Sequence, residues 1–306
     1  MVVTPPRFAN KHDFRSLGLH LQHPISHGFW PPRMTPSATY EPIPVAVNDC
    51  RPQLDTTEDK NIQAICEQLA GKVDSFLESD APTPLLRRVQ TQTRSALAVI
   101  VKALERYSLE EISISYNGGK DCLVLLVLYL SALVPTAAHM KSRTLPTALP
   151  SVYVIAPHPF NEVDDFVTAS VSEYHLDLAR YAMPMKDAFI RYLEDYPKIK
   201  AILVGTRRTD PHGKSLTHFD ETDSGWPSFM RVHPVIDWQY AEIWAARFLR
   251  HLEIPYCPLY DHGYTSLGGK SDTRQNPALH RNGHQQNFRP AYELQDDHSE
   301  RLGRDG

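Results

Sequence analysis

Residues 112–130 read ISISYNGGKDCLVLLVLYL and predict a strand, a tight loop and a helix in direct succession. The segment ISISY is of the β type, and an apolar helix begins at about Lys120. Gly118 and Gly119 lack a Cβ atom and therefore let an anion come close to the backbone. The helix would direct its first N–H groups and the positive end of its dipole toward that anion. The stretch is therefore typical of a phosphate-binding loop; the alternative is an ordinary turn in a parallel sheet.

The composition is that of an ordinary soluble globular protein. The 306 residues are 42% hydrophobic and 22% charged, with a formal net charge of -4. A bulk nucleic-acid binder would show a basic excess instead. No apolar run reaches the roughly 18–20 residues of a transmembrane helix. We therefore expect small-molecule substrates, and neither nucleic acid nor a membrane, as partners.

The cysteines and the amino-terminal segment bear on the compartment. The four cysteines form no C-x-x-C pair, which argues against a zinc site and a disulfide framework: Cys50, Cys66, Cys122 and Cys257. A reducing compartment, the cytoplasm, is the expected location. Residues 1–40 contain one acid, Asp13, and several basic residues, so a mitochondrial presequence is the alternative. Prolines would interrupt the amphipathic helix that such a presequence needs.

Hydrophobic periodicity divides the chain at about residue 55. Residues 1–55 hold nine prolines and no sustained period, which predicts an arm rather than a domain. Residues 56–306 are expected to form one domain that includes the carboxyl-terminal tail. Within it we predict helices over 62–73, 85–107, 161–178, 185–196 and 238–251. Predicted strands cover 112–116, 152–155 and 201–205, with a fourth at Val235, and 133–150 is expected to be a loop.

Strands that alternate with helices predict an α/β fold with a doubly wound, mostly parallel sheet and extra amino-terminal helices. In such sheets ligands bind at the carboxyl ends of the strands. The candidate site residues fall there. Asn117 and Asp121 lie four residues apart across the start of the predicted helix, and an amide with a carboxylate suits Mg²⁺. The alternative for Asp121 is that it only caps its own helix.

Two later segments add polar groups. After the strand at 201–205 come Arg207 and Arg208, which could bind phosphate oxygens, and Asp210, which could orient them or hold the metal. The alternative is a solvated basic turn closed by Asp-Pro. Residues 222–227 read TDSGWP. Hydroxyl groups, a glycine and a large aromatic side chain suit a flat heteroaromatic ligand, although the segment alone indicates only a polar loop with a tryptophan.

The segment SYNGGKDC at 115–122 resembles the PP-loop of enzymes that split the α-β bond of ATP, usually SGGxDS, with Asn117 and Cys122 in place of the two serines. This combination resembles the eukaryotic, fungal-type FAD synthases, relatives of the PAPS reductases. Further matches follow in order over roughly 95–304: an R-x-T-D-P turn, the T-D-S-x-W-P segment, a P-Y-C-x-L-Y signature at 255–268, N-P-x-L, R-P-A-Y-x-L and a terminal E-R-x-x-R.

The resemblance implies a PAPS reductase or PP-loop fold (adenine nucleotide alpha hydrolase-like) and FMN adenylyltransferase activity, in which ATP and FMN give FAD and pyrophosphate with Mg²⁺ as cofactor. It implies Mg²⁺ ligands at Asn117 and Asp121. Its implied catalytic residues are Asn117, Asp121, Asp210, Arg301 and Arg304. Its implied nucleotide-binding residues are Ser115, Tyr116, Gly118, Gly119, Val154, Gly205 and Arg207. Its implied flavin-binding residues are Thr222, Asp223, Ser224, Gly225, Trp226 and Arg231.

The chain departs from the family at a few points. Ile155 stands where relatives commonly have an acid, the Pro-rich arm has no counterpart, and we do not expect a molybdopterin-binding domain of the animal type before the synthase region. One alternative is a PAPS reductase-like thiol oxidoreductase or a PP-loop sulfur transferase. Both need a reactive cysteine near the carboxyl terminus, and no cysteine follows Cys257, which we interpret as a packed thiol like Cys122. A non-catalytic flavin- or nucleotide-binding protein is the other alternative. We expect a monomer.

Overall fold

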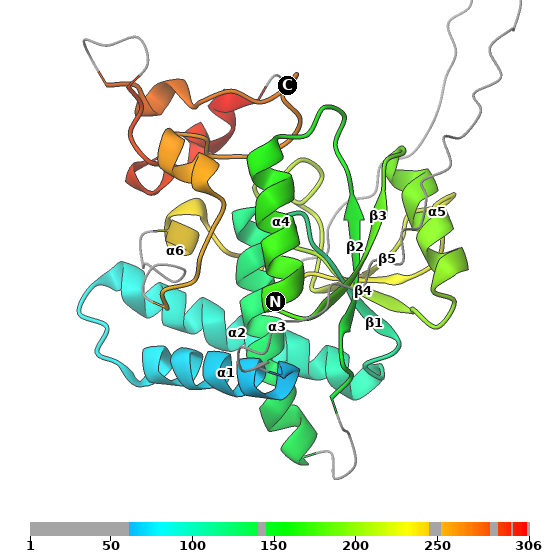
Figure 1. Cartoon of the computed structure of the whole chain (residues 1–306). Helices are drawn as coiled ribbons and strands as arrows, with labels where there is room; N and C mark the ends of the chain where they lie inside the picture. Colours follow the sequence, from blue (N-terminus) through cyan, green and yellow to red (C-terminus); the bar gives the residue numbers. More distant parts are fainter. Residues whose placement is uncertain (1–60, 140–144, 245–251, 282–286, 295, 305–306) are drawn as a thin grey trace, which may run out of the picture. The chain divides into compact units, whose positions relative to one another are not determined.

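A six-stranded sheet with the strand order β3-β2-β1-β4-β6-β5 forms the centre of the domain (Figure 1). The computed structural model describes residues 61–139, 145–244, 252–281, 287–294 and 296–304; the predicted arm lies outside these ranges. The strands are β1 (Ile112–Ser115), β2 (Leu149–Val154), β3 (Leu176–Tyr181), β4 (Ala201–Leu203), β5 (Phe219–Glu221) and β6 (Met230–Val232). All pairs are parallel except β5 with β6, so the predicted mostly parallel α/β sheet is confirmed.

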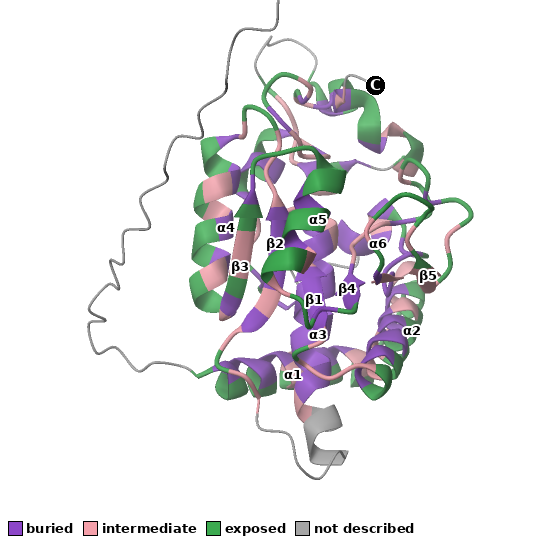
Figure 2. Ribbon diagram, turned by 90° about the vertical axis from the view of Figure 1, so that its right-hand side faces the viewer, coloured by how far each residue is buried: buried purple, intermediate pink, exposed green. Residues whose placement is uncertain are grey.

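Helices cover both faces of the sheet. They are α1 (Ile62–Glu78), α2 (Pro84–Arg106), α3 (Lys120–His139), α4 (Asn161–Glu173), α5 (Met185–Asp195) and α6 (Tyr240–Trp244). In Figure 2, α5 lies in front of the sheet and α3 lies behind it. A small core joins α5 to one face of the sheet, and a larger core joins the other face to the remaining helices. The doubly wound arrangement follows from these two cores.

Helix α3 is the centre of the larger core. Its residues from Cys122 to Leu133 are all buried, because α1 and α2 cover the side that faces away from the sheet. A helix that is apolar on all sides is stable only when it is enclosed in this way. Asn61 caps α1 by accepting a hydrogen bond from the N–H of Ala64. The sequence instead predicts the cap among Thr56, Thr57 and Glu58, which lie outside the described residues.

Several predicted boundaries are wrong. The helix predicted over 161–178 ends at Glu173, because His175 adopts a φ of 50° and the chain then enters β3, an edge strand whose alternating polar residues resemble a helix face. The strand predicted at Val235 is β6, five residues earlier, and Val235 lies in the turn that follows. The loop predicted over 133–150 contains the end of α3 and the start of β2. Beyond α6, residues 245–251 lie outside the described part of the chain.

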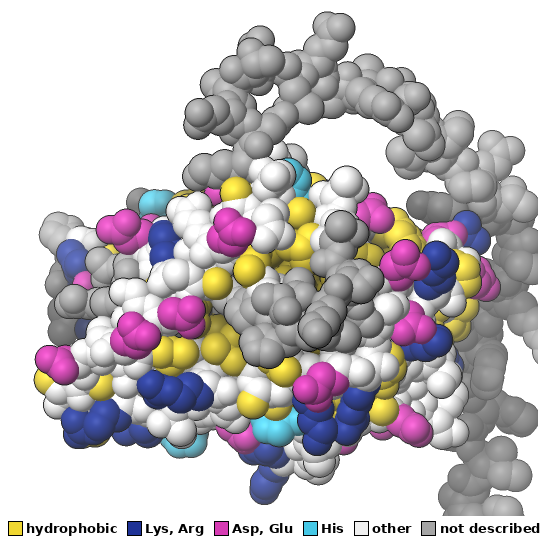
Figure 3. Space-filling model, turned by 90° about the horizontal axis from the view of Figure 1, so that it is seen from below, with side chains coloured by type: hydrophobic (Ala, Val, Ile, Leu, Met, Phe, Trp, Pro, Cys, Tyr) yellow, Lys and Arg dark blue, Asp and Glu magenta, His cyan; other side chains and the backbone are white. Residues whose placement is uncertain are grey.

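The carboxyl-terminal segment consists of short 3-10 helices, orange to red in Figure 1, that lie beside the carboxyl ends of the strands. They are η1 (Pro258–His262), η2 (Pro277–Leu279), η3 (Ala291–Glu293) and η4 (Asp297–Gly303). On the face drawn in Figure 3, acidic and basic side chains are interspersed among apolar ones and neither sign dominates. Of the described helices, none is both long and apolar enough to span a bilayer.

Candidate active site

A cavity of about 760 Å³ opens at the carboxyl ends of β1, β2 and β4. This is the edge at which a doubly wound sheet binds its ligands. The last residues of these strands and the residues that follow them supply part of its wall: Ser115, Asn117, Gly119, Asp121, Val154, Gly205 and Asp210. The carboxyl-terminal segment supplies another part: Tyr260, Ser266, Leu267, Arg301 and Arg304. The chain therefore brings five of the motifs singled out in the sequence to one cavity.

The loop after β1 is held closed by its own side chains. Asn117 Oδ1 accepts hydrogen bonds from the N–H of Gly119, at 3.0 Å, and from Cys122 Sγ, at 2.9 Å. The N–H of Lys120 donates to the Tyr260 hydroxyl at 2.9 Å. Burial raises the pKa of the Cys122 thiol to about 12, which agrees with its interpretation as a packed thiol. The amide oxygen of Asn117 already accepts two hydrogen bonds inside the loop, and binding of a metal ion would have to replace part of this network, so its role as an Mg²⁺ ligand stays a prediction.

Two residues of the motif shape the loop from outside the cavity wall. The Tyr116 hydroxyl lies in the core and donates to Ser170 Oγ at 2.9 Å. Gly118 has a φ of 74°, and a Cβ there would lie 2.8 Å from Val167 Cγ2 on α4. Glycine is therefore required at this position by backbone conformation and close packing. For both residues, the predicted nucleotide contact is not seen among the residues that line the cavity.

Gly205 lets the turn after β4 approach the start of α3. A Cβ at this position would lie 2.9 Å from the backbone N of Cys122 and 3.1 Å from the carbonyl carbon of Asp121. We expect Gly205→Ala to lower the free energy of unfolding by about 1–3 kcal/mol, the usual cost of overpacking, and to weaken binding of ATP, the substrate that the resemblance implies, by moving Asp121. Urea unfolding and ATP titration measure the two effects. Gly71→Ala, where nothing lies within 4 Å of the added Cβ, is the control; equal behaviour of the two variants would contradict the account.

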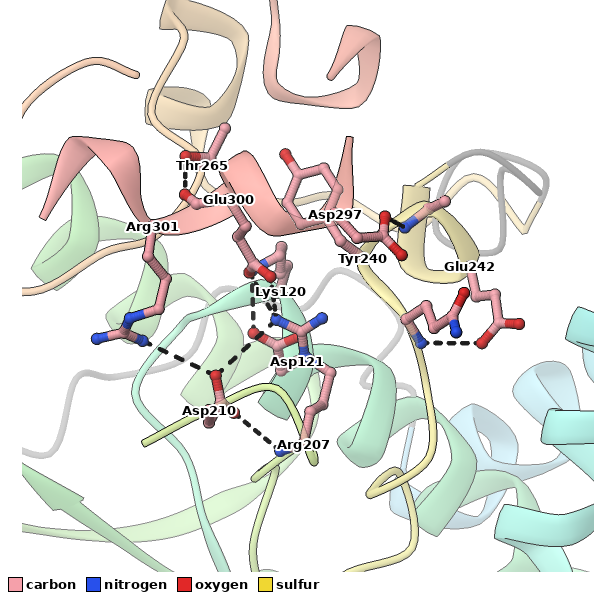
Figure 4. A network of polar contacts seen from close by, with 12 residues as sticks. Lys120, Asp121, Arg207, Asp210, Tyr240, Glu242, Thr265, Asp297, Glu300 and Arg301 are labelled. Carbon is pink, nitrogen blue, oxygen red and sulfur yellow. Dashed lines mark hydrogen bonds and ion pairs between the residues drawn. The ribbon is translucent and has the colours of Figure 1, made fainter. Parts of the chain in front are cut away.

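A cluster of five buried or half-buried charged residues lies beneath the cavity, and we call it the charge cluster: Lys120, Asp121, Arg207, Asp210 and Glu300 (Figure 4). Asp121 lies between two cations, with Arg207 Nε 2.8 Å from Oδ1 and Lys120 Nζ 3.1 Å from Oδ2. Glu300 pairs with the same two cations, at 2.6 Å in each case. The cluster joins α3, the turn after β4 and η4.

The cations decide the protonation of this cluster. Burial alone would raise the pKa of Asp121, but Arg207 and Lys120 outweigh burial and hold that pKa below its usual value. Burial likewise opposes the charge of Lys120, but Asp121 and Glu300 raise its pKa above the usual value. For Asp210, burial and the neighbouring charge of Asp121 raise the pKa. Asp121 is therefore ionised, and its negative charge acts on the neighbouring carboxyl group of Asp210.

Arg207 does not occupy the position that the sequence predicts for it. Its side chain is 1% exposed, it does not line the cavity, and its guanidinium contacts Asp121 and Glu300. Arg208 points elsewhere, with Nε 2.5 Å from Asp237 Oδ1. Neither arginine lines the cavity in this arrangement, and their contact with phosphate stays a prediction. Arg301 and Arg304 do reach the wall, with Arg301 Nη1 3.8 Å from Asp210 Oδ1.

Asp121 and Asp210 are the carboxylates that suit a divalent cation at the wall. Mg²⁺ is usually held by one or two carboxylates together with substrate phosphates and water. Among the described residues, no group of three or more His, Cys, Asp or Glu side chains is arranged to hold a metal. Burial, and after it the negative charge of Asp121, raises the pKa of Asp210, and a cation at the two carboxylates would oppose this effect. Both oxygens of Asp121 are paired with Arg207 and Lys120, so Mg²⁺ would share this carboxylate with them. The two carboxylates therefore fit an ion whose coordination is completed by substrate phosphates and water.

The TDSGWP segment reaches the other end of the same cavity. Thr222, Asp223 and Trp226 line it, together with Arg231, whose Nη1 lies 3.3 Å from Asp223 Oδ2. The sequence analysis places this segment at the carboxyl ends of the parallel strands. Because β5 runs antiparallel to β6, the segment lies instead at the amino end of β6. Strands of three residues are short enough for one cavity to reach both edges.

Within this segment, Ser224 and Gly225 are exposed and do not line the cavity. Gly225 has a φ of 83° and forms the turn. Their predicted flavin contacts are therefore not seen in this arrangement.

The sequence reasoning missed Lys120, Tyr260, Glu300 and His233. His233 lines the cavity, is 1% exposed, and neither ring nitrogen has a hydrogen-bond partner. Burial lowers its pKa to about 4, so the ring is neutral at pH 7. The available signal was the spacing of two residues between Arg231 in β6 and His233 directly after the strand, which places both on the same face.

His233 makes the stability of the fold depend on pH. The unfolded chain protonates this histidine near pH 6.5, whereas the folded chain does so only near pH 4. Between these values the unfolded state binds more protons, so stability should fall as the pH falls, by up to about 3 kcal/mol. Urea unfolding from pH 7 to pH 4 should show this loss, and His233→Gln should lack it. The exposed His262→Gln variant is the control; equal pH dependence in wild type and His233→Gln would contradict the assignment.

Comparison with known proteins identifies the family. The model of the phosphoadenosine phosphosulfate reductase domain matches residues 111–188 and 179–275. A probable FAD synthase of Schizosaccharomyces pombe is 41% identical over 238 residues, which cover 78% of this chain and 88% of the relative. The chain belongs to the FAD synthase family.

Two further relatives support this membership. A probable FAD synthase of Caenorhabditis elegans is 36% identical over 212 residues, but the match covers only 39% of that longer protein. The crystal structure of Candida glabrata FMN adenylyltransferase in complex with FAD and inorganic pyrophosphate superposes with a TM-score of 0.75. It is 28% identical, and the match covers 80% of this chain and 97% of that one. The Candida glabrata enzyme thus has the same overall fold over most of this chain.

Proposed function

We propose that the chain transfers the AMP group of ATP to FMN, giving FAD and pyrophosphate. One observation carries this proposal: a single cavity joins a PP-loop and cationic wall at one end to an aromatic and polar wall at the other. Such a cavity can hold a triphosphate and a second, flat ligand together. The similar Candida glabrata enzyme was solved with FAD and pyrophosphate, the two products of this reaction.

The reaction needs positioning and charge neutralisation more than proton transfer. The phosphate of FMN is already an anion, so one of its oxygens can attack the α-phosphorus of ATP without a strong general base. The new P–O bond forms while the bond to pyrophosphate breaks. Arg301 and Arg304 at the wall would stabilise the negative charge of the leaving pyrophosphate. Asp121 and Asp210 would hold Mg²⁺, which supplies further neutralisation of phosphate charge.

The opposite end of the cavity suits a flavin ring. Trp226 and Phe229 offer aromatic surface, and Met185 of α5 adds a flexible apolar side chain. Arg231 is held by Asp223 and presents hydrogen-bond donors on the same wall. We propose that these residues bind FMN, and that Ser115, Gly119, Val154 and Gly205 line the site of the ATP nucleotide.

The structure does not favour a thiol mechanism. A reactive cysteine acts as the thiolate, but burial raises the pKa of Cys257 to about 11 and that of Cys122 to about 12. The described cysteines are free thiols, and for that reason we propose a reducing compartment, the cytoplasm. We also propose a monomer, as the sequence analysis expects.

The proposal is tested by incubating the purified chain with ATP, MgCl₂ and FMN and separating the flavins by chromatography. FAD and pyrophosphate should form in equal amounts. Riboflavin in place of FMN is the control and should give no product, because it lacks the phosphate that attacks. Binding of FMN and ATP without FAD formation would instead indicate the non-catalytic alternative.

A further inference from the structure

Glu300 is a buried carboxylate that none of the steps above uses. Its side chain is 7% exposed and does not line the cavity, so it touches no substrate space. Lys120 Nζ donates to its Oε1 at 2.6 Å, and Arg207 Nη2 lies 2.6 Å from both of its oxygens. These two cations belong to elements 180 and 93 residues away along the chain. Glu300 therefore fixes η4 to the start of α3 and to the turn after β4.

The backbone of the same residue is fixed independently of its charge. The carbonyl of Glu300 accepts hydrogen bonds from the buried Thr265 hydroxyl, at 2.6 Å, and from the buried Asn276 amide, at 3.3 Å. The Asn276 amide also donates to the carbonyl of Ser299 at 2.7 Å. Side chain and main chain together leave this point of η4 little freedom.

The next residue, Arg301, has much weaker contacts of its own. Its side chain is 43% exposed, and its guanidinium reaches a protein carboxylate only at 3.8 Å, in Asp210. Figure 4 shows Arg301 extending from η4 toward Asp210, while the Glu300 side chain points to Lys120. An exposed pair at this distance gives little orientation by itself. The place of Arg301 at the cavity wall is therefore set by the residue before it.

We propose that Glu300 is a positioning residue that holds Arg301 at the cavity wall, where it binds the pyrophosphate group of the nucleotide. The proposal rests on the proposed function for the reaction, but the coupling between Glu300 and Arg301 is a property of the fold. Lys120 and Arg207 then act as the buried anchor of η4, and Arg301 acts on the ligand.

A double-mutant cycle tests the coupling. The four proteins are wild type, Glu300→Gln, Arg301→Met and the double variant. They are compared by the kcat for FAD formation and by the Kd for inorganic pyrophosphate with Mg²⁺. We expect Arg301→Met to lower kcat about 100-fold and Glu300→Gln to lower it at least about tenfold, with the KM for FMN unchanged. The double variant should fall no further than Arg301→Met, within about twofold.

Losses that multiply in the double variant would show that the two residues act independently and would overturn the proposal. The pyrophosphate titration keeps the two proposals separate. If wild type binds pyrophosphate but forms no FAD, the proposed function fails. The double-mutant cycle measured on the Kd for pyrophosphate then still shows whether Glu300 and Arg301 are coupled. Failure of wild type to bind pyrophosphate would overturn the inference itself.

Glu242→Gln is the matched control. Glu242 is a buried carboxylate with a side chain 2% exposed, and it pairs with Arg88 Nε at 3.3 Å, away from the cavity. Its variant should lose stability in urea unfolding while keeping the wild-type kcat and Kd. A loss of kcat equal to that of Glu300→Gln would mean that general loosening explains both, and would contradict the positioning role.

If Glu300→Gln does not fold, Thr265→Val takes its place in the cycle. This substitution removes the hydroxyl that donates to the Glu300 carbonyl and accepts from the Asn276 amide at 2.8 Å, and it leaves every charge in the charge cluster. We expect kcat to fall about three- to tenfold in the wild-type background, because the hydrogen bonds that hold the Glu300 backbone are weakened, and not at all in the Arg301→Met background. An equal fall in both backgrounds, or none in either, would overturn the proposal.

Discussion

Asp121→Asn should lower the rate of adenylyl transfer by about 10²- to 10³-fold. The carboxylate lines the cavity, and Arg207 and Lys120 keep its pKa low, so it carries its negative charge throughout the working pH range. The amide has the same size but removes the charge that would hold Mg²⁺ near the phosphates. Steady-state kinetics with saturating FMN, at a temperature where circular dichroism shows a folded protein, measure the loss.

The control for this variant is Asp187→Asn. Asp187 lies in the first turn of α5, as Asp121 lies in the first turn of α3. If Asp121 only capped or favoured its own helix, both substitutions would cost about 0.3–1 kcal/mol of stability and neither would change the rate. An unchanged rate in Asp121→Asn would therefore refute the assignment of this carboxylate to the reaction.

Arg207→Met should lower the free energy of unfolding by about 3–5 kcal/mol, because it leaves buried carboxylates without their cation. Asp121 and Glu300 would then share Lys120 alone. Chemical denaturation measures the loss. The double variant Arg207→Met with Glu300→Gln should recover part of the stability, since Lys120 and Asp121 remain paired at 3.1 Å.

Arg207→Met also distinguishes two roles of Arg207: the buried partner of carboxylates that the structure shows, and the phosphate ligand that the sequence predicts. Arg208→Met is the control, because Arg208 lies on the surface beside Asp237 and an exposed pair contributes at most about 1 kcal/mol. Unchanged stability of Arg207→Met together with weak ATP binding would mean that Arg207 contacts the nucleotide directly. That result would contradict its place in the charge cluster.

Local sequence signals were sufficient for the centre of the fold. The β1 strand, the glycine loop and α3 were all predictable, because their hydrophobic periods are long and glycine marks the loop between them. β3 was missed because an edge strand with alternating polar residues shares its pattern with a helix face. β5 was missed because three residues are too short to show a period.

The site was less predictable, because it depends on which charges are buried. Arg207 and Arg208 are neighbours in sequence, but one is 1% exposed and the other 41%. Glu300 looked like part of a charged tail, and only the fold brings it to Lys120. Arg301 and Arg304, by contrast, do reach the cavity wall. Residue type indicated which chemistry was available, whereas long-range packing decided which groups face the ligand.

The central claim is that the bond between the α- and β-phosphates of ATP is broken while the α-phosphate joins FMN. Incubation of the purified chain with FMN, MgCl₂ and ATP labelled with ³²P at the α-phosphorus tests this claim most directly. The account predicts that all of the consumed label appears in FAD, with none in pyrophosphate, and that Asp121→Asn reduces this transfer. Label recovered as free AMP or as ADP, with FMN unchanged, would contradict it.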